Sequence, residues 1–245
     1  MPLALALSPH LDDAAFSAGG ALARLARTGW SVVVATLFTA SVPHPRGFAL
    51  ACQTDKGLAP EVDYMALRRA EDVAACAVLG AIPRHLPLPE APHRGYDDAA
   101  ALFREPHAGD SIDHEAADAI AALLVELQPG LLLAPQAIGG HVDHVLTVRA
   151  LQRLGPALPI LWWRDFPYSI RTDTPRRPYE AFFAALPELA LPAEECARHR
   201  ACAAYVTQLS YQFGGAEGLA RAMAAVGRTE RMRAQHRLPP VVHGH

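Results

Sequence analysis

The chain has 245 residues, of which 51% are hydrophobic and 19% are charged, and its formal net charge at pH 7 is −3. These values are typical of a folded protein with ample core material, and they exclude general disorder. The net charge offers no basic surface for nucleic acid, and no apolar run approaches the length of a membrane span. The four cysteines form no Cys-x-x-Cys motif, which favours free thiols and a cytoplasmic protein.

Strand-like and helical patterns alternate along the chain. Leu3–Leu7 is a short apolar strand, Asp13–Arg27 is helical, and Ser31–Phe38 is the β-branched run of a strand buried on both faces. Further along, the pattern predicts helices at Tyr64–Leu79, around the apolar stripe Ile120, Leu123, Leu124 and Leu127, and at Val145–Leu154, Glu194–Tyr205 and Ala216–Val226, with strands at Arg84–Leu88, Leu131–Ala134 and Ile160–Trp163.

This alternation predicts a single α/β domain in which a mostly parallel sheet carries helices on both faces. We place the domain at residues 1–237 and expect residues 238–245 to form a C-terminal tail. Two long loops, residues 39–63 and 89–113, are rich in Pro and Gly and are expected at the mouth of a site. Gly19 and Gly20 inside the first helix indicate the close approach of a strand or a ligand.

Two short motifs combine imidazole and carboxylate groups just after predicted strands. Residues 8–13 read Ser-Pro-His-Leu-Asp-Asp, and residues 140–144 read Gly-His-Val-Asp-His. Both lie past the carboxyl ends of strands, which is the edge where open α/β sheets bind ligands. Acidic residues at a helix start also serve as caps, and a lone His-x-x-His is frequently a surface feature. Two such motifs at one sheet edge favour a functional site.

The spacing within these motifs suits a hydrolytic zinc site. His10 and Asp13 lie three residues apart and share one face of a first helical turn, and His141 and His144 repeat that spacing. Such a site needs three protein ligands and an open position for water. We assign His10, Asp13 and His144 as the ligands of one zinc ion per chain. Another divalent metal would suit the same His/Asp set.

The remaining polar residues of the motifs have catalytic roles in this interpretation. Zinc lowers the pKa of its bound water toward about 7, and Asp12, beside the metal, takes the proton as general base. A protonated His141 would face the substrate carbonyl, stabilise the oxyanion and later donate to the leaving amine. Asp143 would hydrogen-bond one of the imidazoles and fix its orientation.

The same residues carry a resemblance to a known family. Pro-His-Leu-Asp-Asp followed by two glycines, and later His-Val-Asp-His, is similar to the PIG-L/LmbE-like family of zinc-dependent N-deacetylases. The resemblance implies a Rossmann-like fold and the same zinc ligands, base and assisting histidine. Leu11 and Val142 replace the usual prolines of the family pattern, and Ala14 replaces its usual glutamate.

Three residues are predicted to contact the substrate. Arg68 is assigned by analogy with the family's Arg-x-x-Glu helix, whereas Arg164 and Asp165 are assigned because they follow the strand at Ile160–Trp163 on the functional side of the sheet. The substrate class that the family implies is a small N-acetylated sugar or glycoconjugate. The sequence leaves the sugar, the aglycone and a homo-oligomeric state open.

We therefore predict a metal-dependent hydrolase that removes the acetyl group from an N-acetylglucosamine-type sugar or its conjugate. One alternative is a metallo-amidase or esterase acting on a non-sugar acylated metabolite, which would have an apolar pocket. Another is a catalytically silent ligand-binding homologue, although a structural zinc site has no need of the extra carboxylate of Asp12. A dinucleotide-binding protein ranks low because no Gly-x-Gly-x-x-Gly follows the first strand.

Overall fold

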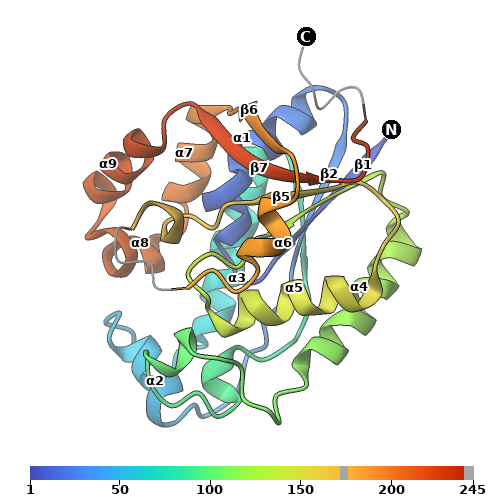
Figure 1. Cartoon of the computed structure of the whole chain (residues 1–245). Helices are drawn as coiled ribbons and strands as arrows, with labels where there is room; N and C mark the ends of the chain where they lie inside the picture. The colour runs from blue at the N-terminus through green and yellow to red at the C-terminus, as the bar shows by residue number, and fades with distance from the viewer. Residues whose placement is uncertain (172–175, 240–245) are drawn as a thin grey trace.

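The computed structural model describes residues 1–171 and 176–239. Within these ranges, a seven-stranded sheet with the order β3-β2-β1-β4-β5-β7-β6 forms the centre of the molecule (Figure 1). The strands are β1 (Leu3–Ser8), β2 (Ser31–Thr36), β3 (Ile82–His85), β4 (Leu131–Pro135), β5 (Ile160–Trp163), β6 (Glu188–Pro192) and β7 (Thr229–Gln235). The first five pair in parallel, whereas β7 runs antiparallel to both β5 and β6.

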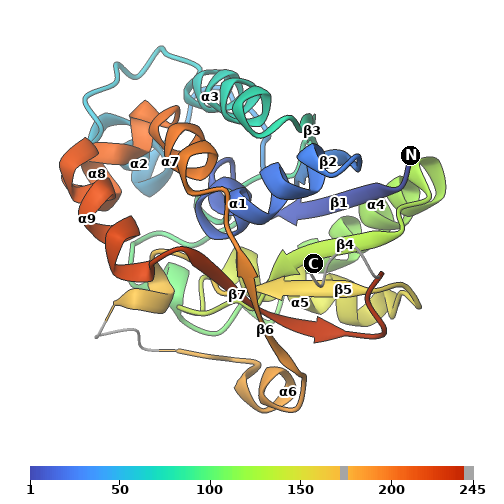
Figure 2. The same cartoon turned by 90° about the horizontal axis from the view of Figure 1, so that it is seen from above.

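Helices cover both faces of this sheet (Figure 2). They are α1 (Asp13–Arg27), α2 (Gly47–Thr54), α3 (Tyr64–Leu79), α4 (Ile112–Leu127), α5 (Val142–Leu154), α6 (Glu180–Ala184), α7 (Glu195–Ala203), α8 (Val206–Phe213) and α9 (Ala216–Val226). Alternate strand residues enter different cores, because side chains of a strand point to opposite faces. Ala4 and Ala6 pack with α1, α3, α7 and α9, whereas Leu5 and Leu7 pack with α4 and α5.

The structure confirms the predicted α/β class and most of the predicted elements. The predicted bounds of α1, α3, α9 and β5 agree with those observed. The strand predicted at Arg84–Leu88 is shifted, because β3 begins at Ile82, in register with Val33 of β2. The helix predicted from Val145 begins instead at Val142, because His141 provides its N-cap.

Several elements were not predicted, among them α2, α6, α8 and the antiparallel pair β6 and β7. In β7 the buried positions alternate as expected for a strand, but one of them is Glu230. Its carboxylate accepts hydrogen bonds from the backbone amides of Gly20 and Ala21 in α1, at 2.8 and 2.7 Å. The strand was not predicted because a glutamate occupies one of the positions where the alternating pattern requires an apolar residue.

The glycine pair in α1 is explained by the close approach that the sequence predicted. A Cβ at Gly20 would lie 2.5 Å from the Cβ of Ala193, which follows β6. Only a residue without a side chain allows this contact. The contact and the Glu230 hydrogen bonds together fix the position of α1, whose N-terminus carries the first motif.

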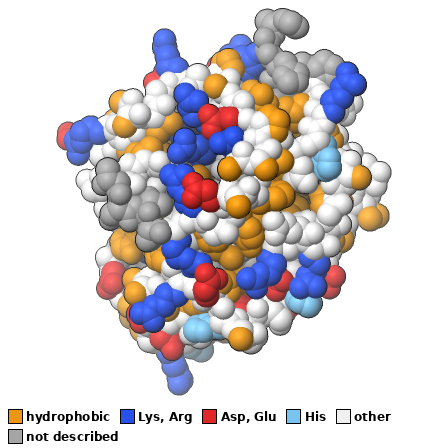
Figure 3. Space-filling view, viewed as in Figure 1, with side chains coloured by type: hydrophobic (Ala, Val, Ile, Leu, Met, Phe, Trp, Pro, Cys, Tyr) orange, Lys and Arg blue, Asp and Glu red, His pale blue; other side chains and the backbone are white. Residues whose placement is uncertain are grey.

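The molecular surface and the cysteines agree with the composition. In the view of Figure 3, basic and acidic side chains are interspersed. The four cysteines are free thiols, as predicted. Among the residues that the structure describes, no helix combines the length and the apolar character needed to span a bilayer. Most of the predicted tail, residues 240–245, lies outside the described residues.

The strand order places both motifs at one point of the sheet. β1 and β4 are neighbouring parallel strands, although they belong to different parts of the sequence. The chain leaves β1 toward β2 on one side and β4 toward β5 on the other, so the topology reverses between them. Such a switch point opens a crevice beyond the carboxyl ends of the two strands. The first motif begins at the end of β1, and the second follows β4 after residues 136–139.

Candidate metal centre

Three histidines from the two motifs converge in this crevice. His10 precedes α1, His141 caps α5, and His144 lies in the first turn of α5. Each offers a ring nitrogen, and these three nitrogens lie within 4.8 Å of one another. The predicted meeting of the two motifs at one sheet edge is therefore observed.

Asp13 lies between two of these rings. Its Oδ2 atom is 3.2 Å from Nδ1 of His10 and 3.1 Å from Nε2 of His144. His144 is 1% exposed, and among the described residues its Nε2 has no hydrogen-bond partner of acceptable geometry. A buried polar atom without a partner is costly. A metal ion held by His10, Asp13 and His144 would satisfy it, so these residues fit such an ion.

Carboxylates behind the rings orient two of the histidines. Nε2 of His10 lies 2.9 Å from Oδ2 of Asp143, and Nδ1 of His144 lies 2.8 Å from Oδ1 of Asp165. With protons on these nitrogens, His10 Nδ1 and His144 Nε2 keep their lone pairs free to bind a metal ion. Metal-binding histidines are commonly oriented by such outer carboxylates.

His141 is oriented by the backbone and differs from the other two. Its Nδ1 accepts a hydrogen bond from the backbone N–H of Asp143 at 3.2 Å. A neutral imidazole that accepts through Nδ1 carries its proton on Nε2. His141 therefore presents an N–H donor to the crevice. The distance of His141 from the other two histidines would allow it to bind a metal. With its proton on Nε2, however, it is better suited to donate a hydrogen bond.

The electrostatics of the crevice suit a cation. Burial opposes protonation of His144, but the Asp13 and Asp165 carboxylates raise its pKa to about 9. Burial also opposes protonation of His10, whose pKa is raised well above its ordinary value by Asp13 and Asp143. For His141, burial and then the charge of His10 lower the pKa well below its ordinary value. The same carboxylate charge would attract a divalent metal.

Asp12 is a second, separate carboxylate of the first motif. It is 3% exposed, and its Oδ2 lies 3.8 Å from Nη2 of Arg68. Burial, and then the neighbouring Asp13 carboxylate, raise the pKa of Asp12 to about 7. A carboxylate with a pKa near the working pH is well matched to proton transfer.

The three predicted substrate contacts lie in different places. Arg68 is buried beside Asp12, and its Nη1 donates to Glu90 at 2.5 Å. Asp165 is 1% exposed and lies behind His144, with its second oxygen accepting from the backbone N–H of Ile138 at 2.9 Å. Its position suits orientation of His144 better than contact with substrate. Arg164 lines a different cavity, of about 190 Å³, which shares no lining residue with the histidine cluster.

Two aromatic residues of the site were missed by sequence reasoning. The ring of Phe103 lies 5.4 Å from that of His141, and the ring of Tyr168 lies 6.0 Å from that of His144, each edge to face. Tyr168 fits there because Gly139 has no side chain: a Cβ at Gly139 would lie 2.7 Å from Cγ of Tyr168. Gly139 was the available signal, but nothing in the sequence identified the ring for which it makes room.

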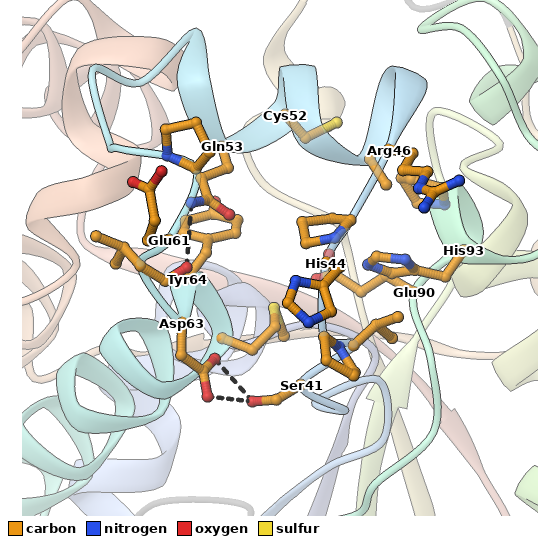
Figure 4. Close-up of a pocket in the computed structure, with 18 residues that line it drawn as sticks. Ser41, His44, Arg46, Cys52, Gln53, Glu61, Asp63, Tyr64, Glu90 and His93 are labelled. Carbon is orange, nitrogen blue, oxygen red and sulfur yellow. Dashed lines mark hydrogen bonds between the residues drawn. The ribbon is translucent and has the colours of Figure 1, made fainter.

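A cavity of about 700 Å³ shares no lining residue with the histidine cluster but reaches Asp12 through Glu90 and Arg68 (Figure 4). It lies between the two loops that were expected at the mouth of the site. Its inner wall includes Glu90, which bonds Arg68, and the neighbouring His93. Figure 4 shows His44 and His93 on one side of the cavity and Glu61 and Tyr64 on the other.

The comparisons with known proteins agree with this geometry. The model of the PIG-L family, described as GlcNAc-PI de-N-acetylase, matches residues 5–154. The chain belongs to the PIG-L family. This family domain contains both motifs, the sheet edge between β1 and β4, and the helix that carries Arg68.

Individual relatives resemble the chain over different lengths. A 2'-N-acetylparomamine deacetylase of Streptomyces fradiae is 35% identical over 172 residues, which cover 69% of this chain but only 58% of that protein. The zinc-inhibited form of teicoplanin deacetylase is 26% identical, with a TM-score of 0.79, over 97% of this chain and 99% of that one. A deacetylase of the teicoplanin biosynthesis pathway is 28% identical, with a TM-score of 0.80, over the same shares.

Proposed function

We propose that this PIG-L family protein is a zinc-dependent N-deacetylase that acts on an N-acetylated glucosamine-type sugar carried by a larger conjugate. One observation carries the proposal. Nε2 of His144, which is buried and has no hydrogen bond among the described residues, and Nδ1 of His10 lie 3.1 and 3.2 Å from the same carboxylate oxygen of Asp13, and the neighbouring Asp12 adds a separate buried carboxylate. A purely structural zinc site would be closed by four ligands and would not need Asp12.

In this proposal, His10, Asp13 and His144 hold one zinc ion, and the proton on Nε2 keeps His141 out of the ligand set. Bound zinc would supply Lewis acidity, which polarises the acetamide and makes water a stronger acid. A different divalent metal could use the same ligands.

The protein's own groups then perform the proton transfers. Asp12 accepts a proton from the attacking water and returns it to the amine nitrogen when the C–N bond breaks, so that acetate and a free amine leave. His141 donates a hydrogen bond from Nε2 to the carbonyl oxygen as negative charge develops there. Because its pKa is lowered, His141 would act as a neutral donor, which refines the protonated role that the sequence suggested.

The cavity supports a conjugate rather than a free monosaccharide. It has a volume of about 700 Å³ and adjoins Asp12 through Glu90 and Arg68. Pockets of this size accommodate ligands larger than a single sugar. Two relatives are named for larger substrates, 2'-N-acetylparomamine and teicoplanin. We propose that Arg68 and Glu90 form the wall against which the acetylated ring rests, and that the cavity holds the rest of the conjugate.

The test is acetate release from a panel of substrates. The panel contains 2'-N-acetylparomamine, an N-acetylglucosaminyl glycopeptide, free N-acetylglucosamine and an N-acetylated alkylamine. Zinc is supplied at one equivalent and in excess, because one relative was solved in a zinc-inhibited form. We expect release from at least one conjugate, faster than from free N-acetylglucosamine.

Two variants serve as controls for this assay. Asp12→Asn should lower the rate of release by at least about 100-fold, whereas Glu126→Gln, on the exposed surface of α4, should leave it unchanged. If acetate is released from the alkylamine alone, the proposed sugar substrate is wrong and the substrate is a non-sugar acylated amine. A zinc-loaded protein that releases acetate from no member of the panel would contradict the proposed activity.

A further inference from the structure

Arg94 is a partly buried arginine behind the histidine cluster. It follows the single-turn helix η1 (Ala91–His93) in the loop 89–113, which the sequence placed at the mouth of the site. Its side chain is 9% exposed. The guanidinium lies 5.2 Å from the ring centre of Phe38 and 5.7 Å from that of Tyr96. Contact with two rings holds the plane of the group and adds cation–π attraction.

Hydrogen bonds fix the guanidinium completely. Nη2 donates to Oδ1 of Asp143 at 2.7 Å and to Oδ2 of Asp110 at 3.0 Å. Nε lies 3.3 Å from both oxygens of Asp110, and Nη1 donates to the carbonyl of Pro89 at 2.6 Å. All three nitrogens are therefore used, and one cation bridges two carboxylates.

Asp143 connects this arginine to the histidine cluster. Its side chain is fully buried, and its second oxygen faces Nε2 of His10 at 2.9 Å and the backbone N–H of Ala91 at 3.1 Å. A buried carboxylate needs a counter-charge. When His10 gives its Nδ1 lone pair to a metal, its ring is neutral, and Arg94 is then the charged partner of Asp143.

We propose that Arg94 is a positioning residue for the metal centre. It holds the Asp143 carboxylate in place and balances its charge, so that Asp143 keeps the His10 ring turned with Nδ1 toward the metal position. The inference rests on the proposed function, because it requires a metal at His10. It assigns the arginine no contact with substrate.

The same residue also links the loop 89–113 to the candidate metal centre. Arg94 joins the two ends of the loop through Pro89 and Asp110, and the hydroxyl of Tyr96 also donates to Asp110, at 2.8 Å. Residues of this loop, including Glu90 and His93, line the cavity. The cavity wall and the orientation of His10 therefore depend on one guanidinium.

The experiment measures zinc affinity by competition with a chromophoric chelator, and the ligand field by the visible spectrum of the cobalt-substituted protein. The variants are Arg94→Met, Arg94→Lys and Arg94→Ala. Outer hydrogen-bond partners of metal ligands contribute about 10- to 100-fold to metal affinity. We expect a loss in that range for Arg94→Met and a smaller loss for Arg94→Lys, which keeps the charge but cannot bridge both carboxylates. Arg94→Met should also shift the cobalt spectrum.

Chemical rescue separates positioning from general stability. Guanidinium ion added at non-denaturing concentration should restore zinc affinity to Arg94→Ala, relative to sodium chloride at equal ionic strength. Arg84→Met is the matched control, because Arg84 pairs with Glu126 on the surface, and it should bind zinc as the wild type does. If Arg94 variants fail to fold in chelator, as judged by circular dichroism, Asp110→Asn provides a milder test and should weaken zinc binding.

The outcomes distinguish this inference from the proposed function. A wild-type protein that binds no zinc or other divalent metal would overturn the metal centre and the role of Arg94 together. Equal zinc affinities and equal cobalt spectra for the wild type and Arg94→Met would overturn only the role of Arg94. A loss of affinity without rescue by guanidinium, accompanied by an unchanged cobalt spectrum, would also contradict positioning.

Discussion

The two motif turns have the same sequence spacing but different local chemistry. In the first, α1 begins at Asp13, so His10 stands outside the helix and both of its ring nitrogens face carboxylates. In the second, α5 begins at Val142, and the N-cap residue His141 uses Nδ1 to accept a backbone N–H. Capping satisfies one of the free amides at a helix start. The position of the helix start therefore decides whether the first residue of the motif is suited to bind a metal.

The contrast shows that the spacing of residues in a motif predicts which side chains lie close together. It does not predict which ring nitrogen of a histidine carries the proton. In the proposed site, the first turn would supply two ligands, His10 and Asp13, whereas the second would supply one ligand, His144, and one N–H donor, His141. The four predictions that follow use this difference.

The largest effect is expected at Asp13, which faces two of the histidines. Asp13→Ala should remove most zinc binding and all acetate release, because its oxygen lies 3.2 and 3.1 Å from the two ring nitrogens that would share the ion. We expect zinc affinity to fall by more than about 100-fold, beyond the usual effect of outer partners. Metal content after dialysis at one equivalent of zinc measures this, and full occupancy would remove Asp13 from the ligand set.

Asp12→Asn should leave zinc content unchanged and lower kcat by about 10²- to 10⁴-fold, because the amide cannot accept the proton from water. Steady-state kinetics on the best substrate of the panel, together with metal analysis, test this prediction. A parallel loss of zinc would instead make Asp12 a ligand. Activity near that of the wild type would require a different base.

His141→Ala tests the difference between the two turns most directly. If His141 is a donor, the variant should keep its zinc and lose about 10²- to 10³-fold in kcat, the usual effect of removing one oxyanion donor. If His141 is instead the third ligand, as its distance to the other two histidines allows, zinc would be lost as in Asp13→Ala. Metal analysis of these two variants side by side decides the ligand set.

The smallest effect is expected at Asp165, which orients His144 from behind. Asp165→Asn leaves only one acceptor oxygen for two donors, Nδ1 of His144 and the backbone N–H of Ile138. We expect zinc to bind about tenfold more weakly than in the wild type, and we expect the KM for substrate at saturating zinc to equal that of the wild type. A large rise in KM with unchanged zinc affinity would favour the direct substrate contact that the sequence suggested.

The sequence predicted the parallel part of the fold well but missed its antiparallel edge. Continuous apolar runs such as Ile160–Trp163 indicate strands covered on both faces, and helices such as Ala216–Val226 show a clear periodicity. β7 was missed because Glu230 occupies a buried position whose partners, the amides of Gly20 and Ala21, lie some 210 residues away in the sequence. Local patterns contain no information about such a partner.

The site shows the same division. The meeting of the two motifs follows from the sheet topology, because motifs at the carboxyl ends of neighbouring parallel strands lie close together. The place of Arg164 did not follow, because a residue just past a strand can point to either face of the sheet. Its side chain lines a cavity with Phe166 and Arg198, away from the histidines.

By itself, the sequence determined the class of the fold and predicted the residue types of the candidate metal centre and the sheet edge at which they meet. These depend on periodicity and on short spacings, which are local properties of the chain. Only the tertiary structure decided the tautomer of His141, the place of Asp165 behind His144, and the link from Arg94 through Asp143 to His10. These depend on which donors and acceptors meet in a buried crevice, and those partners come from loops and strands far apart in the chain.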